Sequence, residues 1–222
     1  MLRTFIIGDI HGCCNTFQRL VLDEICIRKS DKIYCLGDYI DRGPYSKGVI
    51  DFILSLRKSG YHIHTLRGNH EQMLLNSTKS EKAYAHWIRN GGDKTLESYS
   101  AHSIEEMDAA HLDFFRHTHH YIQNNDFILA HAGLNFELSN PFADRQSMLW
   151  IRNFPVDLNY LDGKLLIHGH TYQTSDYIKN QDFIGAINLD GGCVYANKEG
   201  CGSLFALDFY ARKFIEVENL DF

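Results

Sequence analysis

The sequence predicts a mixed α/β fold, with α+β character towards its end, for this chain of 222 residues. Short apolar runs rich in branched and aromatic residues recur along it, and each stops at a Gly, Asp, Asn or His, which is typical of buried strands. Helical patterns lie between the first of these runs, and this alternation favours a mainly parallel sheet. Hydrophobic residues make up 44% and charged residues 23%, the composition of a globular domain rather than of a disordered chain.

The predicted strands and helices follow one another in a regular order. Five strands are expected at residues 4–7, 32–36, 62–66, 126–130 and 164–167. Between the first three, Asn15 is expected to cap one helix, and a second helix is expected to begin at Ser46 and to end at Gly60.

The end of the chain has a different pattern. Residues 186–189, 203–209 and 213–217 are expected to be strands separated by Gly-rich turns with no helix between them. We therefore expect an antiparallel sheet to close the fold.

The stretch 71–120 is polar and is predicted to be helical, with Trp87 and residues 112–115 as apolar anchors. We interpret it as a helical cap beside the active face, within a single domain that spans residues 1–222.

Charge and cysteine usage exclude several classes of protein. Twenty-two basic and 28 acidic residues give a formal net charge of −6, and the lack of a basic stripe argues against nucleic-acid binding. The sequence has no apolar run near the ~20 residues that a membrane span needs, and its first apolar stretch is short for a signal peptide. The six cysteines include no Cys-x-x-Cys pair, so we expect reduced thiols in a cytoplasmic protein.

The polar residues that could carry chemistry come directly after the predicted strands. In α/β sheets the carboxyl ends of the strands form the ligand crevice, so we expect these residues to meet. They are Asp9, His11, Asp38, Asp41, Arg42, Arg67, Asn69, His70, His131, His168 and His170.

This set of oxygen and nitrogen ligands without a thiolate suits Mn²⁺, Fe or Zn²⁺. Asp9 and His11 can reach one ion from a single turn, and a second ion would need Asn69 and two histidines, with Asp38 able to bridge the two. Such a pair of ions can stabilise an in-line displacement. Arg42 and Arg67 lie beside these residues in sequence, and guanidinium groups bind phosphate oxygens, so a phosphate ester is the expected substrate.

Five short motifs carry a resemblance to a known family. They are GDIHG at 8–12, GDYIDRG at 37–43, RGNHE at 67–71, HAG at 131–133 and GHT at 169–171. In this order they resemble the phosphoprotein phosphatase branch of the calcineurin-like metallophosphoesterases, with the compact size of its bacterial and phage members.

The resemblance implies a β-sandwich flanked by helices in four αββα layers, and a role for each motif residue. It assigns the first metal to Asp9, His11 and Asp38, and the second to Asp38, Asn69, His131 and His170. Two divalent ions are implied, with Mn²⁺ expected and Fe or Zn²⁺ as alternatives, and a hydroxide that bridges them would attack phosphorus directly. The resemblance further assigns His70 as the general acid oriented by Asp41, and Arg42, Arg67, Asn69 and, from the segment 149–152, Arg152 as phosphate-binding residues.

Some histidines and cysteines keep a plain structural interpretation. His117, His119 and His120 are expected at the solvated end of a cap helix, with an additional metal site as the alternative. Cys13 and Cys14 are expected to pack at the start of a helix, with an oxidation-sensitive thiol as the alternative. His168 and His170 are equally placed by spacing, and the family motif selects His170 as the ligand.

The functional hypothesis is a metal-dependent phosphomonoesterase similar to bacterial serine/threonine protein phosphatases, with phosphotyrosine as an additional substrate. The alternative is hydrolysis of dinucleoside polyphosphates such as diadenosine tetraphosphate, although Asp41 and Glu71 stand where those hydrolases usually carry other residues. A metal-binding regulatory module without turnover is disfavoured, because such a module would need neither Asp41 and His70 nor the arginines. A phosphorylated protein or a small phosphoester is the expected partner, and the native metal and the oligomeric state stay open.

Overall fold

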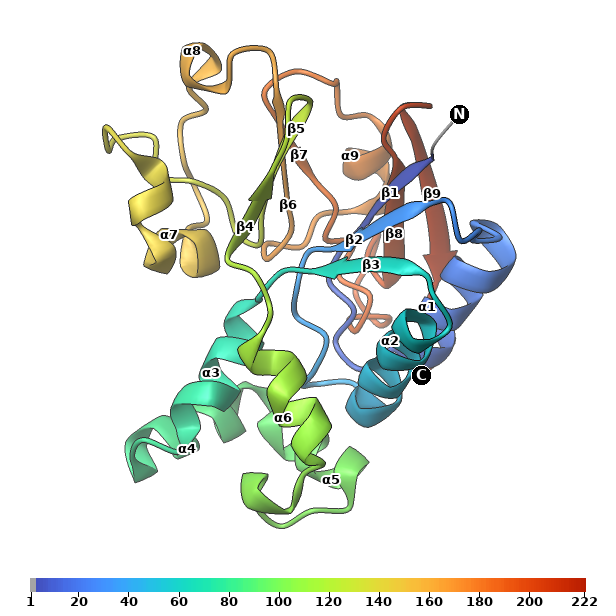
Figure 1. Cartoon of the computed structure of the whole chain (residues 1–222), viewed down its shortest axis with the longest axis vertical. Coiled ribbons are helices and arrows are strands. Elements are labelled where there is room, and N and C mark those ends of the chain that lie inside the picture. The colour runs from blue at the N-terminus through green and yellow to red at the C-terminus, as the bar shows by residue number, and fades with distance from the viewer. Residues whose placement is uncertain (1–2) are drawn as a thin grey trace.

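The computed structural model describes residues 3–222 and contains two β-sheets that pack against each other, with helices on their outer sides (Figure 1). The first sheet has the order β3-β2-β1-β8-β9. Its strands are β1 (Thr4–Ile7), β2 (Lys32–Cys35), β3 (His62–Thr65), β8 (Ser203–Asp208) and β9 (Lys213–Glu218). β1, β2 and β3 are parallel, whereas β8 pairs antiparallel with β1 and β9 antiparallel with β8.

The second sheet has the order β4-β5-β6-β7. Its strands are β4 (Tyr121–Gln123), β5 (Phe127–Ala130), β6 (Leu165–His168) and β7 (Ala186–Asn188). β5, β6 and β7 are parallel, and β4 is an antiparallel edge strand that the sequence did not predict. It is short and mostly exposed, so it lacks the apolar alternation of a core strand.

The expectation of a single antiparallel sheet at the end of the chain is wrong in part. β8 and β9 do form an antiparallel pair, but β7 belongs to the other sheet and runs parallel to β6. The cause is a short helix, α9 (Ser175–Lys179), which makes the crossover from β6 to β7. Ile187 and Leu189 then bury their side chains between the two sheets.

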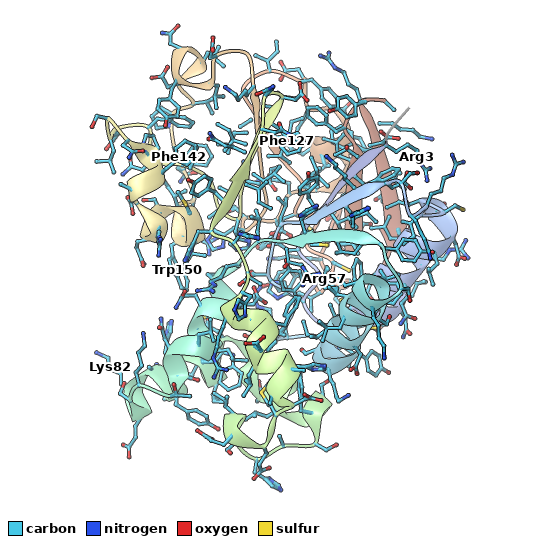
Figure 2. All side chains as sticks on the ribbon, in the orientation of Figure 1. Arg3, Arg57, Lys82, Phe127, Phe142 and Trp150 are labelled. Carbon is cyan, nitrogen blue, oxygen red and sulfur yellow. The ribbon has the colours of Figure 1, made fainter. Side chains whose placement is uncertain are left out.

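Alternation along the strands explains the four layers. Ile6 in β1 and Phe127 in β5 face the core between the sheets, where Figure 2 marks Phe127. Their neighbours face outwards: Phe5 and Ile7 pack against helices on the first sheet, and Ile128 packs against helices on the second. Because side chains alternate across a strand, each strand can serve two cores, and the fold is a mixed α/β sandwich flanked by helices, as expected.

The helices on the first sheet begin with α1 (Cys14–Arg19), which continues as a π-helical turn from Leu20 to Glu24, and α2 (Ser46–Lys58). The expectation that Asn15 caps α1 is wrong, because the helix already begins at Cys14. Asp221, from the far end of the chain, accepts hydrogen bonds from the backbone N–H groups of Asn15 and Thr16 at 2.9 and 3.0 Å. These are donors that an N-cap side chain would otherwise satisfy.

The stretch predicted to be helical does form helices, and Figure 1 shows it at one end of the molecule, beside the strand ends. Its elements are α3 (Asn69–Ser77), α4 (Glu81–Trp87), a π-helical turn (Ile88–Gly92), α5 (Asp93–Tyr99), a 3₁₀ turn (Ile104–Glu106) and α6 (Ala109–Arg116). Trp87 is fully buried, in keeping with its predicted role as an anchor.

The second sheet is covered by α7 (Arg145–Trp150) and α8 (Leu158–Leu161), with a 3₁₀ turn (Pro141–Ala143) before them. No helix within residues 3–222 combines the length and the hydropathy needed to cross a membrane.

Candidate active site

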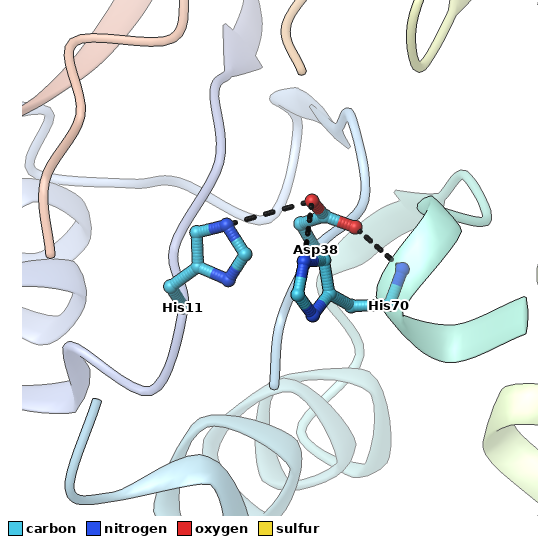
Figure 3. Close-up of side chains that lie close together, drawn as sticks. All are labelled: His11, Asp38 and His70. Carbon is cyan, nitrogen blue, oxygen red and sulfur yellow. Dashed lines mark hydrogen bonds and ion pairs between the residues drawn. The ribbon is translucent and has the colours of Figure 1, made fainter. Parts of the chain in front are cut away.

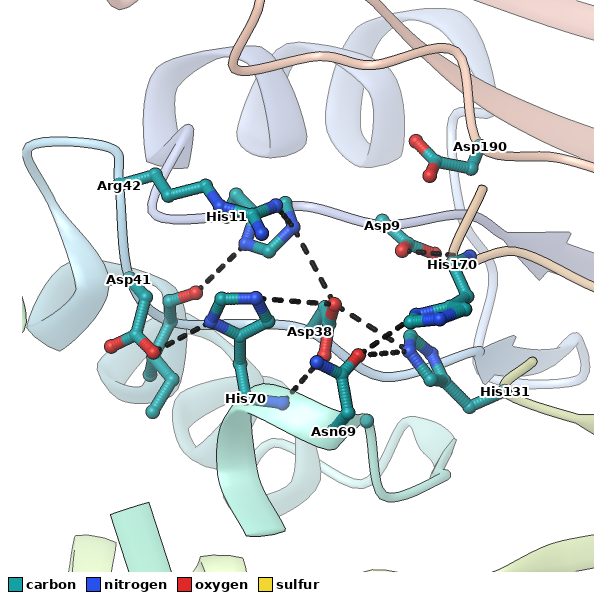
Figure 4. Close-up of polar contacts among 12 residues, drawn as sticks. Asp9, His11, Asp38, Asp41, Arg42, Asn69, His70, His131, His170 and Asp190 are labelled. Atoms are coloured by element: carbon teal, nitrogen blue, oxygen red, sulfur yellow. Dashed lines mark hydrogen bonds and ion pairs between the residues drawn. The ribbon is translucent and has the colours of Figure 1, made fainter. Parts of the chain in front are cut away.

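The ends of five parallel strands bring the predicted site residues together (Figure 4). Asp9 and His11 follow β1, Asp38 follows β2, and Asn69 and His70 open α3 directly after β3. The remaining two, His131 and His170, follow β5 and β6. All seven are buried, with exposed fractions of 8% or less. Both sheets therefore contribute to one crevice, at the edge where parallel strands present their carboxyl ends.

The backbone of this crevice is strained. Five of its non-glycine residues have left-handed φ angles between +47° and +73°, which L-residues rarely adopt. They are His11, Asp38, Asp41, Arg42 and His170. Such angles cost of the order of 1–3 kcal/mol each and are kept mainly where the surrounding structure fixes them, as at functional sites.

Asp38 lies at the centre of the site. Its Oδ2 is 3.5 Å from His11 Nε2, 3.5 Å from His131 Nε2 and 4.0 Å from His70 Nε2. Figure 3 shows His11 and His70 on either side of this carboxylate, with His70 reached also through its backbone N–H. A carboxylate between two groups of potential nitrogen ligands could take part in holding two ions.

Other side chains that could bind a metal ion lie around the side chain of Asn69. Its Oδ1 is 2.9 Å from His131 Nε2 and 2.9 Å from His170 Nδ1. The other nitrogen of His131, Nδ1, lies 3.0 Å from the carbonyl oxygen of Leu36, to which it must donate. Because burial lowers the pKa of His131, its ring is neutral and Nε2 keeps a lone pair directed into the site.

His11 is held in the same way, since its Nδ1 lies 3.0 Å from the carbonyl oxygen of Ile40 and burial lowers its pKa well below the usual value. Its Nε2 is therefore an acceptor, and Arg42 Nη1 lies 2.8 Å from it. Histidine ligands of metals are commonly oriented by such a second hydrogen bond.

The buried oxygen and nitrogen atoms at these strand ends are suited to binding divalent cations. Acceptor atoms converge in two groups, one formed by His11, Asp38 and His70 and one by Asp38, His131 and His170. Two buried atoms, Asp9 Oδ1 and His170 Nε2, have no hydrogen-bond partner among residues 3–222. Burial, and then the charges of Asp190 and Asp38, raise the pKa of Asp9 well above its usual value, so a cation is what would keep this carboxylate ionised.

Such ions, when bound, would activate water and neutralise phosphate charge. Asp9, His11, Asp38, Asn69, His131 and His170 could hold them. The nitrogen and oxygen donors suit Mn²⁺, Fe or Zn²⁺ and do not distinguish among them.

His70 and Asp41 form a buried pair. His70 Nδ1 lies 2.7 Å from Asp41 Oδ2, and the two side chains are 1% and 0% exposed. As the carboxylate only accepts, Nδ1 donates to it. The opposite nitrogen, Nε2, then faces Asp38 and the ligand groups. This arrangement can hold a proton at Nε2 for a group that leaves the phosphate.

The three expected arginines are placed differently. Arg42 lies beside His11, as described. The exposed Arg152 donates to Thr171 Oγ1 at 3.4 Å. The pKa of His170 is lowered to about 3, mainly by burial, then by His131, and to a smaller extent by the charge of Arg152. Arg42 and Arg152 thus lie beside residues that could hold a metal ion.

Arg67 is held by protein groups to a greater extent than the other two arginines. Its guanidinium donates to the carbonyl oxygens of Phe115, Arg116 and Thr118, at the C-terminal end of α6, and to the side chains of Thr118 and Gln72. The carbonyls at the end of a helix lack partners within the helix and attract a cation, so they hold this arginine. All three guanidinium nitrogens of Arg67 thus donate to protein groups, and its contact with a phosphate stays a prediction.

Two residues of the site were missed. Asp190 is 5% exposed, and burial is the main cause that raises its pKa to about 7. It lies beside Asp9 in Figure 4 and follows β7, so the same strand-end pattern could have identified it.

Glu71 lies in the first turn of α3 and is fully buried. It accepts from Gly68 N at 2.9 Å, and it also accepts from the backbone N–H groups of Asp38 and Tyr39 at 2.9 and 2.8 Å. It therefore ties the start of α3 to the loop that carries the central carboxylate.

The remaining histidines and cysteines of the sequence analysis belong to neither group of potential metal ligands. His168 packs against the ring of Phe154 at 5.4 Å, and burial lowers its pKa to about 4. His117 and His119 are exposed at the end of α6, whereas His120 is only partly exposed and its buried Nδ1 has no partner within residues 3–222. Cys13 and Cys14 are buried at the start of α1, the packing interpretation, and burial raises the pKa of Cys14 to about 11.

Curated relatives carry two kinds of name. Serine/threonine-protein phosphatase 1 of Salmonella typhimurium is 37% identical over 103 residues, which cover 46% of this chain and 45% of the relative. Symmetrical bis(5′-nucleosyl)-tetraphosphatases match from Dechloromonas aromatica, 31% identical over 60% of this chain and 44% of the relative, and from Buchnera aphidicola, 28% identical over 82% and 63%. The chain thus spans about half to two thirds of the length of these relatives.

Solved structures support the fold. A candidate diadenosine tetraphosphatase has a TM-score of 0.69 at 22% identity, covering 99% of this chain and 95% of its own. A cold-active protein-tyrosine phosphatase from a Shewanella species reaches 0.67 at 18% identity, covering 99% and 78%. A Saccharomyces cerevisiae protein serine/threonine phosphatase reaches 0.68 at 14% identity, covering 100% and 81%. At these identities the likeness concerns the fold alone.

The family follows from the match to a family model. The model described as calcineurin-like phosphoesterase matches residues 2–189, which include every strand end that contributes to the crevice. This chain is therefore a hydrolase that belongs to the calcineurin-like phosphoesterases.

Proposed function

We propose that this phosphoesterase hydrolyses phosphate monoesters, with phosphoserine and phosphothreonine as preferred substrates and phosphotyrosine as a further one. The observation that supports this choice is the buried contact of 2.7 Å between His70 and Asp41. An alkoxide is a poor leaving group until it is protonated, so a fixed proton donor is worth most for serine and threonine esters.

Each residue has a part in this proposal. Asp9, His11 and Asp38 hold one divalent ion, and Asp38, Asn69, His131 and His170 hold the other, with Mn²⁺ as the expected metal. Arg42, Arg152 and Asn69 bind the phosphate oxygens. His70 donates the proton at Nε2, and Asp41 orients its ring. The substrate is a phosphorylated protein or a small phosphoester.

A second candidate, hydrolysis of dinucleoside tetraphosphates, has support of its own. The relatives named for it are more numerous and align with more of the chain than the protein phosphatase does, so the comparisons favour it over the first. A groove of about 570 Å³ also runs from Arg152 along Phe154, Gln173 and Tyr177. Arg152 is the only charged residue among the described residues that line it, and such a neutral polar and aromatic lining suits a nucleoside.

A direct comparison of hydrolysis rates distinguishes the two candidate functions. With Mn²⁺ added, we expect kcat/KM on a phosphoserine peptide to exceed that on diadenosine tetraphosphate by about tenfold or more. A higher value on the dinucleotide, with ADP as the product, reverses the order of the candidates.

The acid role of His70 has its own test. His70→Asn should lower kcat on phosphoserine by about 10²–10⁴-fold, the usual contribution of general acid catalysis. The loss should be smaller on p-nitrophenyl phosphate, whose leaving group needs less protonation. Equal losses on both substrates would mean that His70 positions the metals or the phosphate instead.

A further inference from the structure

Two residues of the helical stretch contact Asp41 directly. Trp87, at the end of α4, donates from its indole Nε1 to Asp41 Oδ1 and Oδ2 at 3.1 and 3.0 Å. Thr95, in α5, donates from Oγ1 to Asp41 Oδ1 at 2.6 Å and accepts from Asp41 N at 2.9 Å. Asp41, Trp87 and Thr95 are all 0% exposed, so water cannot replace these hydrogen bonds.

With these donors the hydrogen bonding of the carboxylate is complete on both oxygens. Oδ1 accepts from Thr95 and Trp87, whereas Oδ2 accepts from Trp87 and from His70. Burial raises the pKa of Asp41, and the hydrogen bonds from His70 and Thr95 act against this. The plane of the carboxylate, and with it the direction of its bond to His70, is set by the two donors from the helical stretch.

The same stretch shapes the backbone of the loop. Asp41 and Arg42 have φ angles of +73° and +70°, and Arg42 N donates to the carbonyl oxygen of Gly91 at 3.1 Å. Gly91 itself has a φ of +102°, and a Cβ added there would lie 2.7 Å from Arg42 N. The turn between α4 and α5 is therefore in close contact with the loop that carries both the acid partner and an arginine of the site.

We infer that Trp87 and Thr95 are positioning residues for the hydrolytic reaction, which act through Asp41 to hold the ring of His70 in its proton-donating orientation. The inference rests on the role proposed above for His70. It gives the α4–α5 stretch a part in the chemistry, in addition to covering the site. Neither residue touches the substrate, and a loss of either should affect the step that needs the proton, rather than binding.

The test compares substrates that differ in their need for a proton. Thr95→Val keeps the shape of the side chain but can neither donate to Asp41 Oδ1 nor accept from Asp41 N. We expect kcat on phosphoserine to fall about 10–100-fold, a part of the full general-acid contribution, with a fall of less than about threefold on p-nitrophenyl phosphate and little change in KM. Thr95→Ser, which restores the hydroxyl, should recover most of the loss, and Trp87→Phe should behave like Thr95→Val.

Thr65 provides a matched control. It is also buried, and its Oγ1 accepts from Arg57 Nη2 at 2.8 Å, away from the ligand groups. Thr65→Val should lower the melting temperature to a similar extent and leave the ratio of the two rates unchanged. Placed in a His70→Asn background, Thr95→Val should cause no further loss on phosphoserine, because its effect passes through His70.

Several results would overturn the inference. Equal losses on both substrates, or an additional loss in the His70→Asn background, would reduce Trp87 and Thr95 to packing residues. If the wild-type chain cleaves no monoester, the proposed function fails. Whether Trp87 and Thr95 position His70 through Asp41 is then tested by NMR, independently of activity. The proton that His70 Nδ1 shares with Asp41 should give a downfield resonance that is shifted in Thr95→Val and Trp87→Phe and retained in Thr65→Val. An unchanged resonance in Thr95→Val and Trp87→Phe refutes it.

Discussion

Two histidines that lie two positions apart, one at the end of β6 and one just after it, have different surroundings. His170 contacts Asn69 and leaves Nε2 without a partner among the described residues, whereas His168 packs on Phe154. His170 has a φ of +69°, so the chain turns between the two and sends their rings to different places. We expect His170→Ala to lower the metal content towards one ion per chain and to abolish activity, and His168→Ala to retain two ions, both measured by elemental analysis. The reverse pattern would shift the ligand assignment by two residues.

Arg42 and Arg67 have different partners, so their substitution should have different effects. Arg42→Ala should weaken inhibition by inorganic phosphate with both metals retained, because its guanidinium lies beside a ligand of the site. Arg67→Ala should leave phosphate inhibition nearly unchanged and lower the free energy of unfolding by about 1–3 kcal/mol, because several partly buried hydrogen bonds are lost together. If Arg67→Ala weakens phosphate inhibition as strongly as Arg42→Ala does, Arg67 belongs to the clamp after all.

Among the elements, the start of α3 and the end of β2 depend on Glu71. This buried carboxylate accepts from three backbone N–H groups of two different loops, those of Asp38, Tyr39 and Gly68. We expect Glu71→Ala to lower the free energy of unfolding by about 3–5 kcal/mol, since each buried donor left unpaired costs about 1–3 kcal/mol. Because the loop of Asp38 loses its support, affinity for Mn²⁺ should also fall. Denaturant unfolding and metal titration measure the two effects. A free energy of unfolding equal to that of the wild type would contradict the stabilising role of the Glu71 hydrogen bonds.

At the scale of elements, the strand ends could be predicted from the sequence and the sheet partners could not. β1, β2 and β3 each end within three residues of a Gly, and the crossover rule makes them parallel. The strand after β6 was assigned to the wrong sheet, because the five-residue helix α9 carries too few apolar positions to show a periodicity. The partners of Arg67 and Asp41 are likewise distant in sequence, and Trp87 and Thr95 have no local signal that points to Asp41.

In the whole molecule, the sandwich places carboxylates from different strands in one buried crevice. Asp9, Asp38 and Asp190 are each 5% exposed or less, and burial, followed by the charges of Asp190 and Asp38, raises the pKa of Asp9. Without cations these groups repel one another or bind protons, and both cost folding free energy. Divalent ions should therefore stabilise the fold as well as enable turnover, and chelation should abolish activity, with Mn²⁺ expected to restore it best.

Calorimetry with and without metal measures this coupling. An ion at about 100 times its dissociation constant stabilises the folded state by about 2.7 kcal/mol, which for a chain of this size raises the melting temperature by roughly 5–10 °C.

Asp9→Asn removes one of the repelling charges and one of the ligands. We therefore expect the metal-free variant to melt above the metal-free wild type, and to gain less from Mn²⁺, so that the order of the two proteins reverses when metal is added. If both gain equally from Mn²⁺, Asp9 is not a ligand. If the metal-free proteins melt together, the repulsion at this strand end is too weak to matter for the fold, and the left-handed backbone of the site remains the larger cost of building it.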